Sequence, residues 1–208
     1  MKCLGITGGI GAGKSESARF LEGCGIPVLD TDIVARDLVQ PGQPAHADIV
    51  EAFGPGFLDD RGNLDRAALG RRVFEDASAR QRLEAILHPR IFDFWSRWIE
   101  EQRAREAALD RKLCAVVIPL LYEKDYANHF SAIVALACSA GTQRLRLRGR
   151  GWTDGAIDQR LSAQLPMPEK FGRADYGVWS EGCLEVLRDQ LRAVLASEGF
   201  PADSPPSS

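Results

Sequence analysis

Long apolar runs, paired cysteines and an excess of basic charge are all missing from this sequence. No stretch of 18 apolar residues is present, and Met1-Lys2 leads directly into a strand pattern, so we expect neither a membrane span nor a signal peptide. The five cysteines are scattered without a Cys-x-x-Cys spacing, as is typical of reduced core thiols in a cytosolic protein. A formal net charge of -3 disfavours extended binding of nucleic acid, so any anion site must be local. We therefore predict a cytoplasmic protein without a membrane or nucleic-acid partner.

The start of the chain alternates between strand and helix patterns. Residues 2–7 and 26–30 are short and apolar, as buried strands are. The segment between them has apolar residues at helical spacing and stops at Gly25, and residues 31–42 predict a helix that ends at Pro41-Gly42. This order of strand, helix, strand and helix predicts parallel βαβ units.

The rest of the chain begins with a long segment of helical pattern, after which strand patterns return. Residues 45–109 show long, charged helical patterns without a strand, which predicts a helical insertion. Residues 113–119 and 131–138 are continuous apolar runs of the kind that is buried on both faces of a parallel sheet. A last strand is expected near residues 176–179, followed by an amphipathic helix, and residues 199–208 have the composition of a disordered tail.

The stretch from Gly8 to Ser15, GGIGAGKS, matches G-x-x-x-x-G-K-[ST] between a predicted strand and a predicted helix, which is the context of a phosphate loop. Glycines let the backbone wrap a polyphosphate, so that main-chain N–H groups and the positive end of the helix face the anion. Lys14 then supplies a charge to the β and γ phosphates, and Ser15 supplies a hydroxyl to Mg²⁺. A turn that only packs a helix on a strand is the alternative, but it has no use for the final Lys-Ser pair. The predicted nucleotide-binding residues are Gly8, Gly9, Ile10, Gly11, Ala12, Gly13, Lys14, Ser15 and Glu16.

Asparagine is scarce, and its scarcity helps to separate the classes of phosphate-loop protein. The two asparagines, Asn63 and Asn128, are not part of an Asn-Lys-x-Asp motif, which binds guanine in GTPases, so a GTPase switch is disfavoured. The apolar strand at residues 113–119 ends in Pro119, where an ATPase usually has an aspartate for its metal. The missing carboxylate must therefore come from another part of the chain.

Asp30 and Asp32 are the best source of that carboxylate, because they follow the second predicted strand at the edge of the sheet where ligands gather. A carboxylate there can accept the proton of an attacking hydroxyl, or hold a metal-bound water, during in-line phosphoryl transfer. Asp32 is equally a preferred helix N-cap residue, and that interpretation stays open. Asp30 or Thr31 can serve as the cap in its place, which leaves Asp32 for chemistry.

Arginine alternates with leucine and glycine from Arg144 to Arg150. On a helix, Arg146 and Arg150 share one face at i,i+4, and both can reach a γ phosphate as its charge redistributes in the transition state. A solvated basic face is the alternative. Flanking glycines favour a mobile lid that closes over nucleotide, and they stand at positions 149, 151 and 155.

Several motifs in order give the chain a resemblance to the dephospho-coenzyme A kinases, from about Lys2 to Leu195. TGGIGAGKS is the family's form of the phosphate loop, and VLDTDIVARDLVQPGQPA is similar to its DADxxAR…VxxPGxPA signature. LHPRI and VIPLLYE resemble its HPxI and VPLLxE signatures, and TQRLRLRGR falls where the family has its lid arginines. The resemblance implies the α/β P-loop NTPase fold of three layers, with a parallel sheet, a helical substrate-binding insertion and a lid. The implied segments are a nucleotide-binding core at 1–44, 110–140 and 175–198, a helical CoA-binding region at 45–109, a lid at 141–174 and a tail at 199–208.

The resemblance also implies a reaction. This is transfer of the γ phosphate of ATP to the ribose 3′-hydroxyl of dephospho-CoA, with Mg²⁺, as the last step of coenzyme A biosynthesis. On the matching positions Asp32 is the general base, Lys14 and the loop amides hold ATP, and Arg146 and Arg150 are lid charges that act on the transferred phosphate. The acceptor pocket is implied to be lined by Asp32, Arg36, His88, Pro119, Leu120, Leu121 and Glu123.

The residues alone leave parts of this assignment open. A histidine before a proline, such as His88, is equally a structural residue, and Glu123 is equally an acid in the first turn of a helix. The chain also departs from the family pattern at four places: Glu16 where Thr is common, Ala137-Cys138 without an aspartate, Gly151 in place of an acid, and Ser180 in place of an asparagine. Because none of these replaces Lys14, Ser15 or Asp32, we expect an active enzyme with altered nucleotide affinity.

Two other functions stay open at the level of sequence. A nucleoside or nucleotide kinase shares the phosphate loop, the lid and the aspartate after the strand, and differs in its acceptor. A non-catalytic regulator that binds ATP shares the loop, but it has no need of Asp32 as a base. For the assembly, we expect a monomer or a small homo-oligomer.

Overall fold

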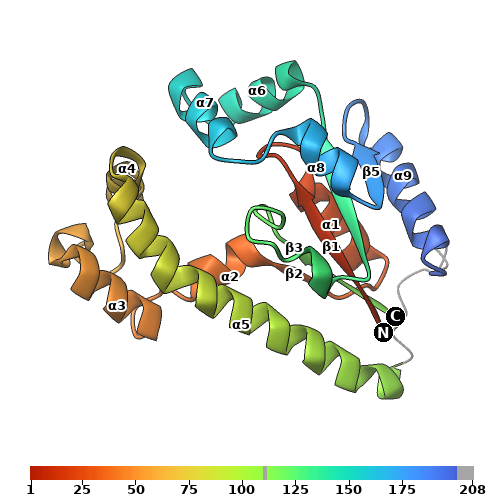
Figure 1. The fold of residues 1–208 in the computed structure, drawn as a ribbon, viewed down its shortest axis with the longest axis horizontal. Coiled ribbons are helices and arrows are strands. Elements are labelled where there is room, and N and C mark those ends of the chain that lie inside the picture. The colour runs from red at the N-terminus through yellow and green to blue at the C-terminus, as the bar shows by residue number, and fades with distance from the viewer. Residues whose placement is uncertain (110–111, 201–208) are drawn as a thin grey trace. The chain divides into compact units, whose positions relative to one another are not determined.

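Five parallel strands form one sheet in the computed structural model, which describes residues 1–109 and 112–200 (Figure 1). The strand order is β2-β3-β1-β4-β5, so that β1 lies in the middle, paired with β3 on one side and β4 on the other. All five predicted strands are confirmed, and so is the α/β class. The strands are β1 (Lys2–Gly8), β2 (Val28–Asp30), β3 (Leu113–Val117), β4 (Ala132–Ala137) and β5 (Tyr176–Trp179).

Helices connect these strands, as parallel pairing requires. The helical texture predicted for residues 45–109 is confirmed, because α3, α4 and α5 occupy most of this segment. The α-helices are α1 (Lys14–Gly23), α2 (Thr31–Asp37), α3 (Pro44–Phe53), α4 (Arg66–Glu75), α5 (Ala77–Leu109), α6 (Ala140–Arg148), α7 (Asp154–Ser162), α8 (Met167–Arg173) and α9 (Leu184–Ser197). Two short 3-10 helices are η1 (Pro55–Phe57) and η2 (Ala127–His129).

The chain divides into two compact units. One unit consists of Met1–Asp30 with Glu101–Ser208 and carries the whole sheet, and the other consists of Thr31–Glu100. The first boundary follows β2 directly, and the second falls within α5. Within the predicted tail, Phe200 packs against the core of the first unit, and residues 201–208 lie outside the described part of the chain.

The alternation of side chains along β1 explains the layers of the first unit. Leu4 and Ile6 belong to a buried cluster that includes residues of α1 and α9. The opposite face carries Gly5 and Thr7, and α8 packs against β1 and β4. Helices therefore cover both faces of the sheet, which explains why β1, β3 and β4 are apolar almost throughout.

The second unit has its own apolar core. Ile49 of α3 and Leu69 of α4 are buried there, with Val39, Ala45 and Leu64. Side-chain caps fix its helix starts: the carboxylate of Asp65 accepts hydrogen bonds of 3.0 and 2.9 Å from the main-chain N–H groups of residues 67 and 68 at the start of α4. Asp76 does the same before α5, and its hydrogen bonds with Ser78 and residue 79 lower its pKa to about 2.

The cysteines match the sequence-based interpretation in part. All five thiols are free, and Cys3, Cys114 and Cys138 are buried. Cys3 and Cys114 are register partners on neighbouring strands, and their hydrogen bond together with burial raises the pKa of Cys3. Cys183 is exposed at the start of α9, so the expectation of a core thiol is wrong there.

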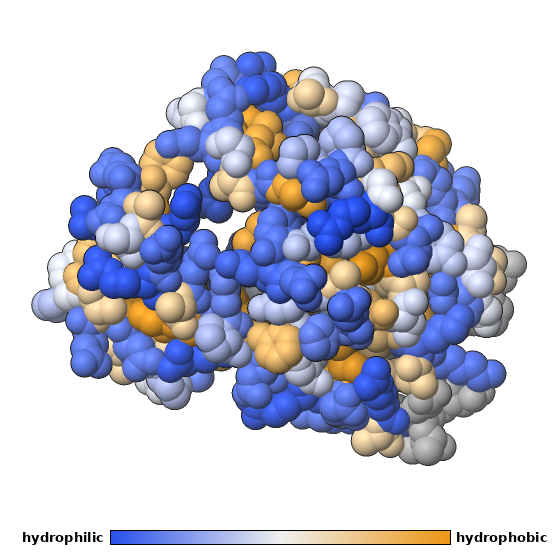
Figure 2. Space-filling model, in the orientation of Figure 1, coloured by the Kyte–Doolittle hydropathy of each residue, from blue (hydrophilic) through white to orange (hydrophobic). Residues whose placement is uncertain are grey.

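The surface in view is mostly hydrophilic, with apolar residues set singly or in small groups among polar ones (Figure 2). Scattered apolar residues of this kind are normal for a protein surface. Among the helices of the described residues, none combines the length and the apolar character that crossing a membrane demands. The large apolar residues that are exposed are Ile33, Phe74, Phe94, Leu145, Trp179, Leu184 and Val186.

Gly177 gives a test of the packing between β5 and α8. A methyl group there would lie 2.3 Å from two ring atoms of Phe171, so we expect Gly177→Ala to lower the free energy of unfolding by about 1–3 kcal/mol. Gly70 is the matched control, because a methyl group in the middle of α4 meets nothing within 4 Å and should stabilise the helix by about 0.5–1 kcal/mol. Urea unfolding of both variants measures the difference. Equal stability of Gly177→Ala and the wild type would contradict the close contact.

Candidate active site

Residues 8–15, the phosphate loop, connect the end of β1 to the start of α1, as the sequence predicts. Gly13 caps α1 with a left-handed φ of 94° and no side-chain hydrogen bond, a conformation that favours glycine. A methyl group on Gly8 would lie 2.4 Å from the carbonyl oxygen of Leu136 on β4. The glycines at these two positions are therefore needed for the path of the backbone itself.

The loop presents main-chain donors at the positive end of α1. Among the described residues, the N–H groups of Gly11, Gly13 and Ser15 have no protein acceptor. The Nζ atom of Lys14 lies 2.9 Å from the carbonyl oxygens of both Gly8 and Gly9, so its charge is held over the same loop. Unused amides, a helix N-terminus and an ammonium group together make a site for a polyphosphate.

A pocket of about 240 Å³ adjoins this loop within the first unit. Arg146 on α6 donates a hydrogen bond of 3.1 Å to the Gly11 carbonyl, and it also contacts the Ser180 side chain at 3.0 Å and the Ser180 carbonyl. Helix α6 ends at Arg148, so Arg150 lies beyond the helix and not on it, although both arginines line the pocket. The expectation of a shared helix face is wrong, because Gly149 and Gly151 form a tight turn there. The remaining lining residues are Gly11, Gly13, Glu16, Ser180, Gly182, Cys183, Leu184 and Leu187.

Two departures from the family pattern have a structural explanation at this pocket. Ser180 is buried, and its hydroxyl accepts a hydrogen bond of 3.0 Å from Arg146, so the side chain at this position has a polar partner in the pocket. The Glu16 carboxylate forms an ion pair with Arg19 one turn along α1, which offsets its negative charge beside the phosphate loop.

Glu181 ties the start of α6 to the end of β5. Its carboxylate accepts hydrogen bonds from the side chains of Ser139 and Thr142 and, at 2.8 Å, from the indole N–H of Trp179. These bonds, led by the one from Ser139, lower the pKa of Glu181 to about 2. The helix that carries Arg146 is thereby anchored beside Ser180.

Residues 119–123, the 119–123 loop, follow β3 at the same edge of the sheet as the phosphate loop. Leu121 is fully buried, and Pro119 and Leu120 are partly buried. Glu123 is not in a helix: its Oε1 atom accepts from the ammonium of Lys170 at 2.7 Å, and its buried Oε2 atom has no hydrogen-bond partner among the described residues. The first-turn interpretation of Glu123 is therefore wrong, and this loop holds an acid that is only half satisfied.

Three of the predicted site residues belong to the unit Thr31–Glu100. Asp32 is exposed in the first turn of α2, which begins at Thr31, so Asp32 lies inside the helix and not at the N-cap position. Arg36 is exposed in the last turn of α2, and its carbonyl accepts hydrogen bonds from Gln40 and Arg66. His88 is half-buried within α5, with its Nδ1 atom 3.9 Å from the Glu84 carboxylate.

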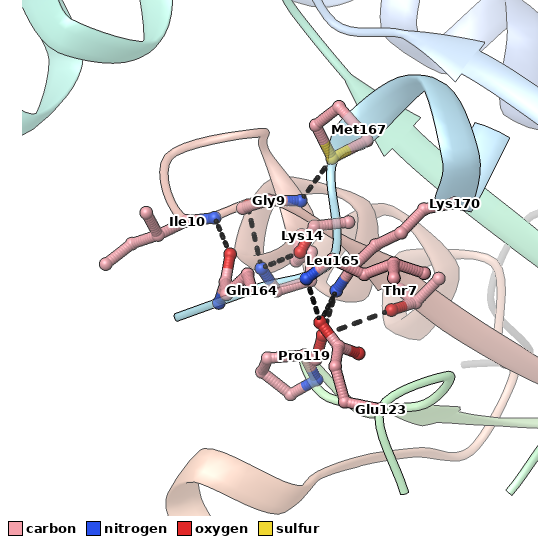
Figure 3. Close-up of polar contacts among 11 residues, drawn as sticks. Thr7, Gly9, Ile10, Lys14, Pro119, Glu123, Gln164, Leu165, Met167 and Lys170 are labelled. Atoms are coloured by element: carbon pink, nitrogen blue, oxygen red, sulfur yellow. Dashed lines mark hydrogen bonds and ion pairs between the residues drawn. The ribbon is translucent and has the colours of Figure 1, made fainter. Parts of the chain in front are cut away.

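Residues that the sequence gave no reason to single out also contact the phosphate loop. The side-chain amide of Gln143 donates to the Ile10 carbonyl at 2.6 Å. The Gln164 carbonyl accepts from the Ile10 N–H at 3.2 Å (Figure 3). The sulfur of Met167 lies 2.9 Å from the Gly9 nitrogen. Single glutamines and a methionine in a charged segment carry no spacing signal, so only the folded chain identifies them.

The donor set fits a magnesium ion that is held mainly by substrate phosphates. The described residues contain no group of three or more His, Cys, Asp or Glu side chains arranged to hold a metal. Mg²⁺ at kinase sites commonly takes one or two protein ligands together with phosphate oxygens and water. The Ser15 side chain is exposed in the first turn of α1, beside the loop amides, and can be such a ligand.

Comparison with known proteins agrees with this geometry. A family model described as dephospho-CoA kinase matches residues 2–185. A dephospho-CoA kinase from Anaeromyxobacter dehalogenans is 44% identical over 197 residues, covering 94% of this chain and 92% of the relative. A second one, from Chromobacterium violaceum, is 42% identical over 193 residues and covers 91% of each chain.

Solved structures give the same picture. The crystal structure of TT1252 from Thermus thermophilus matches with a TM-score of 0.75 and 34% identity, over 94% of this chain and 97% of that one. A dephospho-CoA kinase from Campylobacter jejuni matches with a TM-score of 0.62 over 94% and 96% of the two chains, and its 20% identity supports the fold alone. The predicted P-loop kinase fold is confirmed. The family model and the curated relatives together show that this chain belongs to the dephospho-CoA kinase family.

Proposed function

We propose that this protein transfers the γ phosphate of ATP to the ribose 3′-hydroxyl of dephospho-CoA, which completes coenzyme A biosynthesis. The observation that carries the proposal is the row of unused main-chain donors in the phosphate loop, at Gly11, Gly13 and Ser15, beside the Lys14 ammonium. Such a row in a dephospho-CoA kinase has a triphosphate as its natural ligand. Incubating the purified protein with ATP, Mg²⁺ and dephospho-CoA tests the proposal by formation of coenzyme A. Turnover on nucleosides without turnover on dephospho-CoA would overturn it.

On the donor side, Lys14 and the loop amides hold the phosphates, and the pocket of about 240 Å³ takes the rest of the nucleotide. Arg146 is already fixed by the Gly11 carbonyl and by Ser180, so its charge is in place before the reaction begins. Fixed charges stabilise the developing charge of the transferred phosphoryl group without reorganisation. Arg150 lines the same pocket and is the second positive charge on this side.

Magnesium and location are part of the proposal. The Ser15 hydroxyl is the side chain that would hold Mg²⁺, which would neutralise part of the charge of the bound phosphates. A cytoplasmic location suits an enzyme that uses ATP and has five free thiols. We also propose a monomer or a small homo-oligomer.

Asp32 is the proposed general base. It follows the end of β2 by two residues, and the carboxyl ends of parallel strands share the edge of the sheet at which the phosphate loop begins. Because α2 begins at Thr31, Asp32 is not used as an N-cap. Its carboxylate accepts the proton of the 3′-hydroxyl as that oxygen attacks the γ phosphorus.

The acceptor is proposed to contact Arg36, His88 and the 119–123 loop. Arg36 supplies a positive charge one turn after Asp32, and Glu123 has a buried oxygen to which no other described residue donates. Leu120, which is only partly buried, gives the loop an apolar side chain that suits the uncharged parts of the acceptor. Leu121 is fully buried and packs beside Gly5 of β1, so it shapes the loop from inside.

The base can be tested by Asp32→Ala. We expect kcat to fall by about 10²-fold or more with little change in the affinity for ATP, because a base acts on the acceptor and in the transition state. Asp37→Ala is the control, since Asp37 is exposed on the same helix and has no proposed role. Steady-state kinetics and calorimetry measure the two effects. If kcat survives in Asp32→Ala, another group is the base.

Lys14 acts on both the bound and the reacting triphosphate. We therefore expect Lys14→Met, which keeps most of the apolar stem, to weaken ATP binding by about tenfold and to lower kcat by a further 10²-fold or so. Calorimetry gives the affinity and single-turnover kinetics give the chemical step. A higher KM with an unchanged kcat would show that Lys14 takes no part in the chemistry.

A further inference from the structure

One short segment, residues 164–170, contacts two loops at the same edge of the sheet. We call it the bracket. It runs from the end of the α7 region into α8, and Figure 3 shows Gln164 and Met167 in contact with the phosphate loop and Lys170 in contact with Pro119 and Glu123. The two loops follow β1 and β3, which are paired neighbours in the sheet. The bracket therefore joins the loop that holds the phosphate donor to the loop proposed to line the acceptor pocket.

On the donor side, the bracket occupies two amides of the phosphate loop, those of Gly9 and Ile10. Met167 accepts from the Gly9 N–H at 2.9 Å, and Gln164 accepts from the Ile10 N–H at 3.2 Å. Gln143 of α6 donates to the Ile10 carbonyl, so both main-chain polar groups of Ile10 are bound by side-chain amides. A methyl group on Gly9 would lie 2.7 Å from the Gln143 amide nitrogen, which shows how closely the loop is enclosed.

On the other side, the bracket contacts the 119–123 loop mainly through Lys170. This lysine is 0% exposed, and its ammonium lies 2.8 Å from the Pro119 carbonyl and 2.7 Å from the Glu123 carboxylate. The main-chain N–H of Leu165 donates to the same carboxylate oxygen at 2.8 Å. Thr7, the β1 residue before the phosphate loop, donates to the same Pro119 carbonyl at 3.3 Å, so β1 and the bracket contact one atom of the 119–123 loop.

A role in folding alone does not account for these contacts. A buried ion pair usually gives less stability than apolar residues of similar volume, because both charges lose their hydration. Directional polar contacts instead fix the relative position of the groups they join. Phosphoryl transfer needs this, since a displacement of about 1 Å between the reacting groups can cost about 10²-fold in rate.

We propose that Gln164 and Lys170 are positioning residues, which act as one unit to hold the phosphate loop in register with the 119–123 loop for in-line transfer. The proposal rests on the proposed function. Neither side chain is assigned a contact with the reacting atoms. Gln164 acts through the Ile10 peptide, and Lys170 acts through Pro119 and Glu123.

The test is a double-mutant cycle of Gln164→Ala and Lys170→Met. Each single variant should lower kcat by about 10-fold to 100-fold, while the Kd for ATP rises by no more than about threefold, because the loop amides still bind the phosphates. The kcat of the double variant should be close to that of the slower single variant, because either substitution alone already disrupts the unit. Gln164 is only half-buried, so Gln164→Ala should also keep the melting temperature of the wild type.

Lys2→Met is the matched control. Lys2 forms a lysine–glutamate pair of 2.8 Å with Glu198, whose side chain is 9% exposed, at the other end of β1, about 20 Å along the strand from the phosphate loop. This variant should keep kcat within about twofold of the wild type, whatever it does to the melting temperature. Lys170→Arg, which keeps the charge and the donors, should recover part of the kcat lost in Lys170→Met.

The outcomes separate the two levels of the argument. Wild-type protein that forms no coenzyme A would overturn the proposed function. Two results with an active wild type would overturn the bracket and leave the proposed function unaffected. One is a wild-type kcat in Gln164→Ala, and the other is strict additivity of the two single-variant effects on kcat. If Lys170→Met regains the wild-type kcat when it is assayed at a temperature well below its melting temperature, the loss of kcat comes from unfolding alone. That result would also overturn the bracket.

Discussion

The main-chain amides at the end of β1 are the constraint on which the rest of the active-site region depends. A loop that turns its N–H groups toward one point needs glycine at Gly13, where φ is 94°, and no Cβ at Gly8, where β4 is too close. Other groups around the loop must also hold it in this shape. Gln143, Arg146 and the bracket supply those contacts, and all three come from the segment that follows β4.

Much of this arrangement was predictable from the sequence. Continuous apolar runs identify the strands because helices cover both faces of the sheet, and GGIGAGKS identifies the loop because few other structures need those glycines and that lysine together. Arg146 could also be identified, because arginine alternates with leucine and glycine from Arg144 to Arg150 and glycines flank this run, a pattern typical of a lid over nucleotide. What could not be predicted is which polar residues are buried, since Gln143 and Lys170 occupy ordinary positions in charged helical segments.

The misplaced details have local causes. Helical spacing alone puts Arg150 on one face with Arg146, but the turn at Gly149 and Gly151 ends α6 first. Glu123 follows an apolar strand, as an acid at the start of a helix often does. In the structure it lies in a turn, where its carboxylate pairs with the ammonium of Lys170, a residue far away in the sequence. Contacts between residues so distant in sequence leave no local pattern. The departures at Glu16 and Ser180 likewise make sense only with their partners Arg19 and Arg146 in place.

The central claim is that the loop amides bind a triphosphate, and calorimetry of ATP, ADP and AMP binding in the presence of Mg²⁺ tests it most directly. If the amides of Gly11, Gly13 and Ser15 and the Lys14 ammonium are the binding groups, affinity should fall stepwise as phosphates are removed, by about tenfold or more between ATP and AMP. Equal affinity for the three nucleotides would show that the base and ribose alone are recognised, and it would contradict the account.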